Sequence, residues 1–371
     1  MVVLAGLGLT SMAAAGPAPR EFLAEAKALL VVGACAPGTA TDVKPEIVDR
    51  HCRTVRAAQE QYKTRWLAAA GPWFAANVPK AVPKTVVYPF AGGDLATALA
   101  VYPDADEITT LSLEPAGDPL ALGKLSEKEL TNALAIVEKE LGSLYRYNFS
   151  VTTNMIEAMR GGKLPTQLIF SLSALVIHGY EPTAMRYFQL ADDGQVRYLT
   201  QTDIDELQKL KGVGERNKAF ANVEIRFKQP NGREQIYRHI LANLDDSHLK
   251  KAPAALRHLE AKGHVAAMTK AASYLLTFDE FSTMRRYIVD HVEWMVSDST
   301  GLPPNLGEKA GFEYETWGTY EESNMKEGSS VTPQWRALYA AQPRRALAFR
   351  FGYPDGKWRG HLIVMRRPVK H

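Results

Sequence analysis

The segment from Thr85 to Asp118 most constrains what this chain can fold into. Thr85–Phe90 is rich in β-branched and aromatic residues, which is typical of a buried strand. A glycine turn at residues 91–93 follows, and Asp94 is placed to cap a short helix. Glu107–Leu113 then reads as a second strand. A strand, a turn, a helix and a strand within one short segment form a βαβ unit, which requires a parallel sheet. The segment therefore predicts an α/β protein with a Rossmann-like mixed sheet flanked by helices.

The rest of the 371 residues contains further helical patterns and turn signals. Helices are expected at residues 20–32, 43–70, 126–145, 151–160, 165–177 and 278–290, and further strands at residues 265–276 and 294–297. Three antiparallel hairpins are expected where Gly-containing turns separate strand-like runs. They join residues 185–190 to 195–200, 222–228 to 234–241, and 346–353 to 360–366. The first two either extend the sheet or form a small inserted lobe.

The predicted domain organisation has three parts. Residues 1–19 are expected to be a signal peptide, and residues 20–84 a helical N-terminal region with a possible disulfide. Residues 85–371 are expected to form the α/β domain, with a hairpin-containing lobe inserted at about 142–250.

Ligand sites of open α/β sheets lie outside the carboxyl ends of the strands, near a topological switch point. Three loops of this chain are expected there, following Thr85–Phe90, Glu107–Leu113 and residues 294–297. Glycine permits close backbone approach, and nucleoside-binding folds hold ribose hydroxyls with an acid at the end of the second strand. The ligand-binding candidates in these loops are Tyr88, Gly92, Gly93, Asp94, Glu114, Asp118 and Asp298.

The strand, the glycine turn and the acidic end of the second strand resemble class I methyltransferases, in which these elements bind S-adenosylmethionine. The closing strands FRFGY and HLIVM are similar to the end of that fold. The turn differs, because this chain has PFAGGD instead of D/E-x-G-x-G. YPFAGGD and SLEPAGD also resemble segments of a family of bacterial exported proteins, a resemblance that implies no particular activity.

The N-terminus predicts export. Residues 2–15 are uncharged and mostly apolar, and they end in Ala13-Ala14-Ala15, although no basic residue precedes them. A short apolar run with small residues at its end is typical of a secretory signal and too short for a membrane span. We therefore expect a periplasmic or extracellular protein that is not an integral membrane protein. A buried helix is the alternative interpretation.

The two cysteines, Cys35 and Cys52, are expected to form one disulfide in an oxidising compartment. A loop of this size contributes about 3 kcal/mol in the chain-entropy model. The alternative is that VVGAC is a lipobox with a lipid on Cys35. Charged residues shortly before it make lipoprotein anchoring the weaker interpretation.

Charge and motifs restrict the remaining function classes. The formal net charge of +3 is small for this length, and nucleic-acid binders usually gather basic residues on one face. No nucleic-acid partner is therefore predicted. No metal site is predicted either. Residues 243–247 carry several side-chain oxygens, which suits either a divalent cation or, more simply, the cap of a following helix.

Two functions remain open. The first is a non-catalytic binding or scaffold protein for an unknown small molecule or an envelope protein, with an unknown cofactor if any. The second is an enzyme, a transferase or hydrolase, that uses Asp94, Glu114 and Asp298. The enzyme hypothesis predicts that these carboxylates converge in one pocket and that at least one has a raised pKa.

Overall fold

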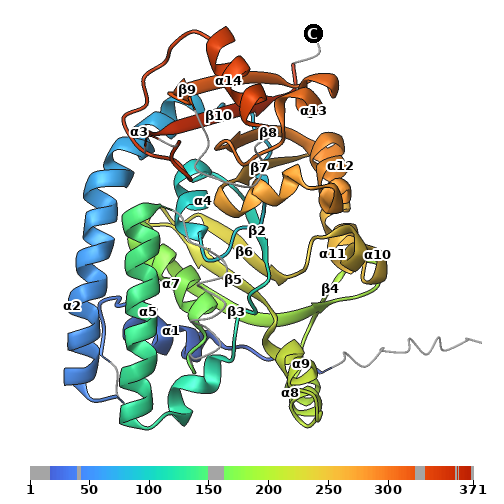
Figure 1. Cartoon of the computed structure of the whole chain (residues 1–371). Coiled ribbons are helices and arrows are strands. Elements are labelled where there is room, and N and C mark those ends of the chain that lie inside the picture. The colour runs from blue at the N-terminus through green and yellow to red at the C-terminus, as the bar shows by residue number, and fades with distance from the viewer. Residues whose placement is uncertain are drawn as a thin grey trace, which may run out of the picture.

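A ten-stranded mixed sheet forms the centre of the computed structural model (Figure 1). The structure describes residues 17–39, 43–148, 163–321, 331–355, 357 and 359–368. The strand order is β4-β3-β5-β6-β2-β1-β7-β8-β10-β9. The strands are β1 (Thr85–Pro89), β2 (Glu107–Ser112), β3 (Glu181–Leu190), β4 (Val196–Tyr198), β5 (Asn222–Lys228), β6 (Glu234–Leu241), β7 (Val265–Thr269), β8 (Val292–Ser297), β9 (Glu313–Gly318) and β10 (His361–Arg366).

The five central strands, β6-β2-β1-β7-β8, are parallel. On one side β5, β3 and β4 continue the sheet in antiparallel pairs, and on the other side β10 lies antiparallel between β8 and β9. The chain leaves β1 toward β2 on one side and later adds β7 on the other side. The boundary between β1 and β7 is therefore the topological switch point, the position at which open α/β sheets bind ligands.

Helices cover both faces of the sheet. The described α-helices are α1 (Leu23–Val32), α2 (Pro45–Gln61), α3 (Ala68–Asn77), α4 (Leu95–Val101), α5 (Glu127–Tyr147), α7 (Thr166–His178), α8 (Gln201–Gln208), α9 (Val213–Asn217), α10 (Asp246–Lys251), α11 (Ala254–Glu260), α12 (Ser282–His291), α13 (Pro304–Lys309) and α14 (Thr332–Ala341). Successive strand residues point to opposite faces, so Val86 and Tyr88 pack with α1–α5 and α7, whereas Val87 packs with α10, α11, α12 and α14.

One long helical segment runs along the first face. Helix α2 continues into a π-helical turn, η1 (Tyr62–Leu67), and then into α3, which contains Pro72. The turn carries Tyr62 and Trp66, whose rings stack with centroids 5.0 Å apart. The Trp66 indole N–H donates to the Arg350 carbonyl at 2.6 Å, so this segment is tied to the C-terminal part of the chain. Helix α5 lies beside α2 (Figure 1).

Local capping signals are confirmed. Asp94 caps α4, and Ser126 forms a capping box with Glu129 at the start of α5. In the 243–247 segment, Asp245 accepts from the His248 N–H at 2.9 Å and caps α10. This is the helix cap that was one of the two interpretations of the segment. The first two predicted hairpins are β3–β4 and β5–β6, and both belong to the main sheet. The helix predicted at residues 151–160 lies outside the described residues.

The third predicted hairpin is wrong. The strand β10 pairs with β8 and β9, and residues 346–353 form no strand. The aromatic alternation at Phe349 and Phe351 reflects burial against the helical face, because both rings lie near Phe74. Gly352 has φ of +63°, which bends the chain over the strand ends. The predicted strand at residues 265–276 is also too long, since a 3₁₀ helix, η4 (Ala271–Thr277), replaces its second half.

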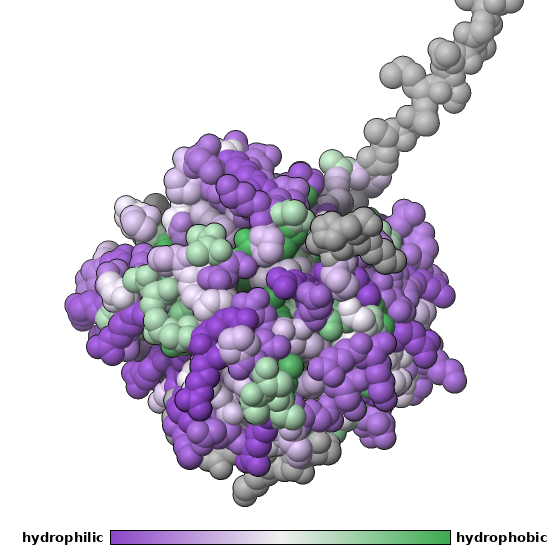
Figure 2. All heavy atoms as spheres, turned by 90° about the horizontal axis from the view of Figure 1, so that it is seen from above, coloured by the Kyte–Doolittle hydropathy of each residue, from purple (hydrophilic) through white to green (hydrophobic). Residues whose placement is uncertain are grey.

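The predicted disulfide is confirmed: Cys35 and Cys52 are bonded, with Cα atoms 5.2 Å apart. Among the described residues, no helix is long and apolar enough to cross a membrane. The face drawn in Figure 2 is mainly hydrophilic, and its apolar residues form small separate groups. Residues 1–16, which carry most of the predicted signal peptide, lie outside the described residues.

Candidate functional site

A cavity of about 280 Å³ opens at the carboxyl ends of four neighbouring parallel strands. The loops after β1, β2, β6 and β7 surround it. Most of the lining is apolar, and the charged members are acidic. The lining residues are Phe90, Gly92, Ser112, Leu113, Glu114, Ala242, Asn243, Leu244, Asp245, Ala272, Leu275 and Phe281. The cavity thus lies at the switch point expected from the strand order.

Glu114 is the buried acid of this cavity. It follows β2, its side chain is 1% exposed, and neither carboxylate oxygen has a hydrogen-bond partner among the described residues. Burial raises the pKa of Glu114, whereas the Ser112 hydroxyl and the backbone N–H groups of Leu113 and Glu114, which face the carboxylate without reaching hydrogen-bond geometry, act in the opposite direction. Buried polar groups are nearly always hydrogen-bonded, so this carboxylate beside a cavity can accept a hydrogen bond from a bound molecule.

His239 on β6 holds the backbone of Glu114 in place. Its Nε2 donates to the Glu114 carbonyl at 2.7 Å, and its Nδ1 lies 3.3 Å from the Thr110 hydroxyl. Burial lowers the pKa of His239 to about 4, so the ring is neutral at pH 7. Since Nε2 carries the proton, Nδ1 accepts from Thr110. His239 was not predicted as a site residue from the sequence, because a histidine in a strand does not reveal which loop its side chain contacts.

Asp94 is not among the described residues that line this cavity but belongs to a buried polar cluster at the ends of β1 and β7. Its carboxylate forms an ion pair with Lys270 and accepts from the Thr97 hydroxyl at 2.7 Å. The Lys270 ammonium also donates to Thr97 and to the Asn148 side chain, each at 3.0 Å. Burial lowers the pKa of Lys270, and the charge of Asp94 opposes that effect. Sequence reasoning missed Lys270, which it placed inside a strand.

Asp298 follows β8 and acts as an acceptor for backbone N–H groups. It accepts from Ala271 at 3.0 Å, from Thr300 at 2.9 Å and from Tyr353 at 2.9 Å. A Cβ atom at Gly352 would lie 2.0 Å from its Oδ2, so only glycine allows the chain to pass this closely. The segment around Gly352 therefore covers the end of β8 and leaves Asp298 fully buried.

The three carboxylates of the enzyme hypothesis are consequently in different situations. Glu114 lines the cavity with no partner, whereas Asp94 and Asp298 are used by a helix cap, an ion pair and backbone N–H groups. Lys270 interacts electrostatically with both aspartates. The structure does not bring the carboxylates of Asp94, Glu114 and Asp298 together in one catalytic pocket.

The other predicted residues are also divided. Tyr88 is buried and donates to Asp94 at 3.2 Å, and Gly92 lines the cavity. Gly93 packs against Phe170, where a Cβ atom would lie 2.0 Å from the ring. Asp118 lies apart from the cavity, because it caps the 3₁₀ helix η2 (Pro119–Lys124) and pairs with Lys124 at 2.8 Å.

Two non-glycine residues at this edge have left-handed backbone conformations. Phe90, directly after β1, has φ of +59°, and Ala271, after β7, has φ of +53°. Such conformations cost on the order of 1–3 kcal/mol each and concentrate at functional sites. Phe90 thereby directs its ring toward Phe281 across the cavity lining, with ring centroids 5.7 Å apart.

Ser299 and His361 form a second pair with chemical potential. The Ser299 hydroxyl lies 3.0 Å from His361 Nε2, which also accepts from the Ser299 N–H at 2.9 Å. A nucleophilic serine needs a base that is itself oriented by a third group. Among the described residues, His361 Nδ1 faces only the Arg359 backbone and has no side-chain hydrogen-bond partner, so the pair lacks a carboxylate as its third group.

We expect Glu114→Gln to stabilise the protein at pH 8 by on the order of 1 kcal/mol. A carboxyl group whose pKa is raised on folding costs no stability below its unfolded pKa, and the full cost appears above its folded pKa. The gain from glutamine should therefore disappear as the pH falls to about 4. Urea unfolding of both proteins between pH 4 and 8 measures it. Glu206→Gln on exposed α8 is the matched control, and an equal gain at every pH would contradict the prediction.

Comparisons of this chain with protein-family models, with curated proteins and with solved structures give no match. The geometry of the site therefore has to carry the functional argument.

Proposed function

We propose that this protein is an exported, non-catalytic binding protein that takes a small neutral or cationic molecule in the cavity at the strand ends, with Glu114 as its polar anchor. The disulfide supports an oxidising compartment outside the cytoplasm. An envelope protein, the other partner considered, has no comparable support.

The observation that carries this proposal is the unpaired carboxylate of Glu114 in an otherwise largely apolar cavity. Typical ligand pockets have volumes of about 300–1,000 Å³, are mostly apolar and contain a few polar groups that fix the ligand. The cavity, at about 280 Å³, is at the small end of that range. A hydroxyl or amino group of the ligand would donate a hydrogen bond to Glu114, and the apolar part of the ligand would contact Phe90, Leu275 and Phe281.

The charge of the lining supports the ligand class. Glu114 and Asp245 are its charged members, and no lysine or arginine is among the described residues that line the cavity. A phosphorylated or carboxylated ligand would meet only like charge there. An acid at the end of the second strand suits the hydroxyls of a nucleoside-like ligand.

What supports binding over catalysis is the state of the other two carboxylates. A catalytic acid or base must reach the substrate, but neither Asp94 nor Asp298 is among the described residues that line the cavity, and both are already hydrogen-bonded. Their partners lie on β1, on α4, directly after β7 and β8, and in the segment around Gly352, so both aspartates support the walls of the site.

The test is a thermal-shift and calorimetric screen of the oxidised protein with nucleosides, monosaccharides and organic amines, each beside its phosphorylated counterpart where one exists. We expect a neutral or cationic member to bind and its phosphorylated form not to bind. Hydrogen bonds to a charged group contribute about 1.5–3 kcal/mol, so Glu114→Gln should weaken that ligand roughly 10–100-fold. Glu206→Gln should leave its affinity unchanged.

The affinity for the ligand should also depend on pH, and the proposal fixes the direction of that change. A ligand that donates to Glu114 binds the carboxylate form, so its affinity should fall as the pH is lowered through the raised pKa of this group. A panel without any binder, or a binder whose affinity is the same in Glu114→Gln, would contradict the proposed site.

A further inference from the structure

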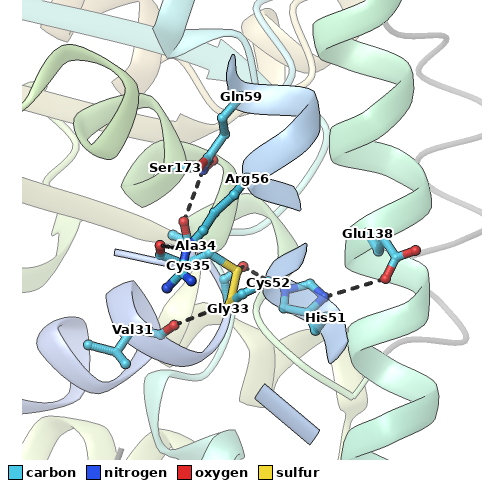
Figure 3. The surroundings of a disulfide bond; sticks show 10 residues. All are labelled: Val31, Gly33, Ala34, Cys35, His51, Cys52, Arg56, Gln59, Glu138 and Ser173. Carbon is cyan, nitrogen blue, oxygen red and sulfur yellow. Dashed lines mark hydrogen bonds and ion pairs between the residues drawn. A yellow bond between two sulfur atoms is a disulfide. The ribbon is translucent and has the colours of Figure 1, made fainter. Parts of the chain in front are cut away.

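A second cluster of possible ligand side chains lies at the disulfide, where the chain after α1 meets α2 (Figure 3). Cys35 follows α1, and Cys52 and its neighbour His51 lie on α2. The two sulfur atoms and one imidazole nitrogen lie within 4.8 Å of one another. All three residues are buried. The cluster has the ligand types of a Cys₂His zinc site.

His51 is only half satisfied in the disulfide form. Its Nε2 lies 3.0 Å from the Gly33 carbonyl, to which it must donate. In the neutral ring Nδ1 then carries no proton, and it has no hydrogen-bond partner among the described residues. Glu138 Oε2 on α5 lies 3.9 Å from Nδ1. Two acceptors therefore face each other, and neither gains from the contact.

We propose that, when the disulfide is reduced, Cys35, Cys52 and His51 bind one Zn²⁺ ion. Reduction takes two electrons and two protons from a dithiol, which itself becomes a disulfide, and gives two cysteine thiols. Zinc binding then releases two protons as the thiols become thiolates. A water molecule completes the four ligands of an open site.

The distances suit this change. Zn–S bonds of about 2.3 Å and Zn–N bonds of about 2.0–2.1 Å place tetrahedral ligands roughly 3.5 Å apart. The bonded sulfur atoms must separate, and the overall spread of 4.8 Å must contract by roughly 1 Å. Both changes are within reach of side-chain rotation about Cα–Cβ bonds.

Zinc binding would also satisfy His51. Figure 3 shows its ring between the disulfide and Glu138. When Nε2 binds the metal, it gives up its hydrogen bond to the Gly33 carbonyl and the ring proton moves to Nδ1, which donates to Glu138 once the 3.9 Å separation closes. Ligating histidines commonly donate their second nitrogen to a carboxylate, which fixes the ring and strengthens the metal site. Glu138 thus has a positioning role in this proposal.

The loop that carries Cys35 is held by contacts other than the disulfide. The Arg56 side chain donates to the Cys35 carbonyl at 3.1 Å, and Gln59 donates to the Ala34 carbonyl at 3.0 Å. Gln59 also reaches Ser173 on α7 at 2.9 Å. These contacts would keep the two thiols close to His51 after reduction, so that the site does not have to reassemble.

The experiment uses the full chain, reduced with a phosphine, in which thiol titration finds two free cysteines. Co²⁺ is the probe, because thiolate ligation gives a charge-transfer absorbance and tetrahedral Co²⁺ gives strong visible bands. We expect one Co²⁺ per reduced chain, displaced by Zn²⁺, and neither band in the oxidised chain. Zn²⁺ should raise the melting temperature of the reduced chain only.

Variants separate the roles. His51→Gln should weaken Co²⁺ binding at least 100-fold and remove the tetrahedral bands, whereas His264→Gln, an exposed histidine paired with Glu293, should change neither. Glu138→Gln should weaken binding roughly 10–100-fold with the spectrum retained. Because Glu138 is 34% exposed, this variant tests the site even if His51→Gln fails to fold. Absence of the charge-transfer band in the reduced chain, or equal affinity of His51→Gln and His264→Gln, would overturn the proposal.

Discussion

Lys270→Met lowers the free energy of unfolding by about 3–5 kcal/mol, because it leaves the Asp94 carboxylate buried without a counter-charge. Lys270 is 2% and Asp94 3% exposed, so water cannot replace the lost ammonium. The Thr97 hydroxyl and the Asn148 side-chain oxygen would lose a donor as well. Urea unfolding at pH 7 measures the effect, and the melting temperature should fall by several degrees.

The double variant Asp94→Asn with Lys270→Met is the control. It removes both charges, so it should be more stable than Lys270→Met alone although the polar contacts are not restored. Its α4 cap is retained in weaker form, since asparagine also caps helices well. Two results would show that the pair is not energetically coupled. One is a free energy of unfolding of Lys270→Met within about 1 kcal/mol of the wild type. The other is a loss in the double variant that equals the sum of the losses in Lys270→Met and Asp94→Asn.

Replacing both Cys35 and Cys52 by serine lowers the free energy of unfolding by about 3 kcal/mol. The bond joins positions 17 residues apart and thus restricts the unfolded chain, which gains entropy when the bond is removed. It also fastens the end of α1 to α2. Denaturant unfolding of the oxidised wild type and the double serine variant, both with a chelator, measures the difference.

The reduced wild type provides the control for this variant. With chelator present, it should unfold at the same denaturant concentration as the double serine variant, because both lack the cross-link. A double serine variant as stable as the oxidised protein would mean that the contacts of Arg56 and Gln59 alone hold the loop.

Local features of the fold were predictable from the sequence because the interacting groups are neighbours along the chain. The Asp94 cap and the Ser126 capping box are formed within a few residues, and the βαβ unit can be recognised from the pattern of its own residues. The order of the sheet was not predictable in this way. β6 forms a hairpin with β5 but also pairs in parallel with β2, more than a hundred positions earlier, and only tertiary packing determines that pairing.

The candidate site shows the same division. Glu114 was predicted, because an acid after the second strand of a βαβ unit has a known position. Its isolation from Asp94 was not, since that depends on Lys270, whose long-range ion pair leaves no pattern in the sequence. The predicted hairpin at residues 346–353 failed for a related reason. Phe349 and Phe351 alternate as in a strand, yet they are buried against α3, a segment near the other end of the chain.

The position of β10 has a consequence for how the protein is made. In the described sheet, β9 pairs only with β10, and β10 also completes the edge of β8. The edges of β8 and β9 that β10 covers therefore stay unpaired until residues 361–366 have been made. Until then the strand ends of β7 and β8 are uncovered as well, because the segment around Gly352 lies just before β10. The nascent chain exposes these strand edges until β10 has been added, and in this interval it most needs protection from aggregation.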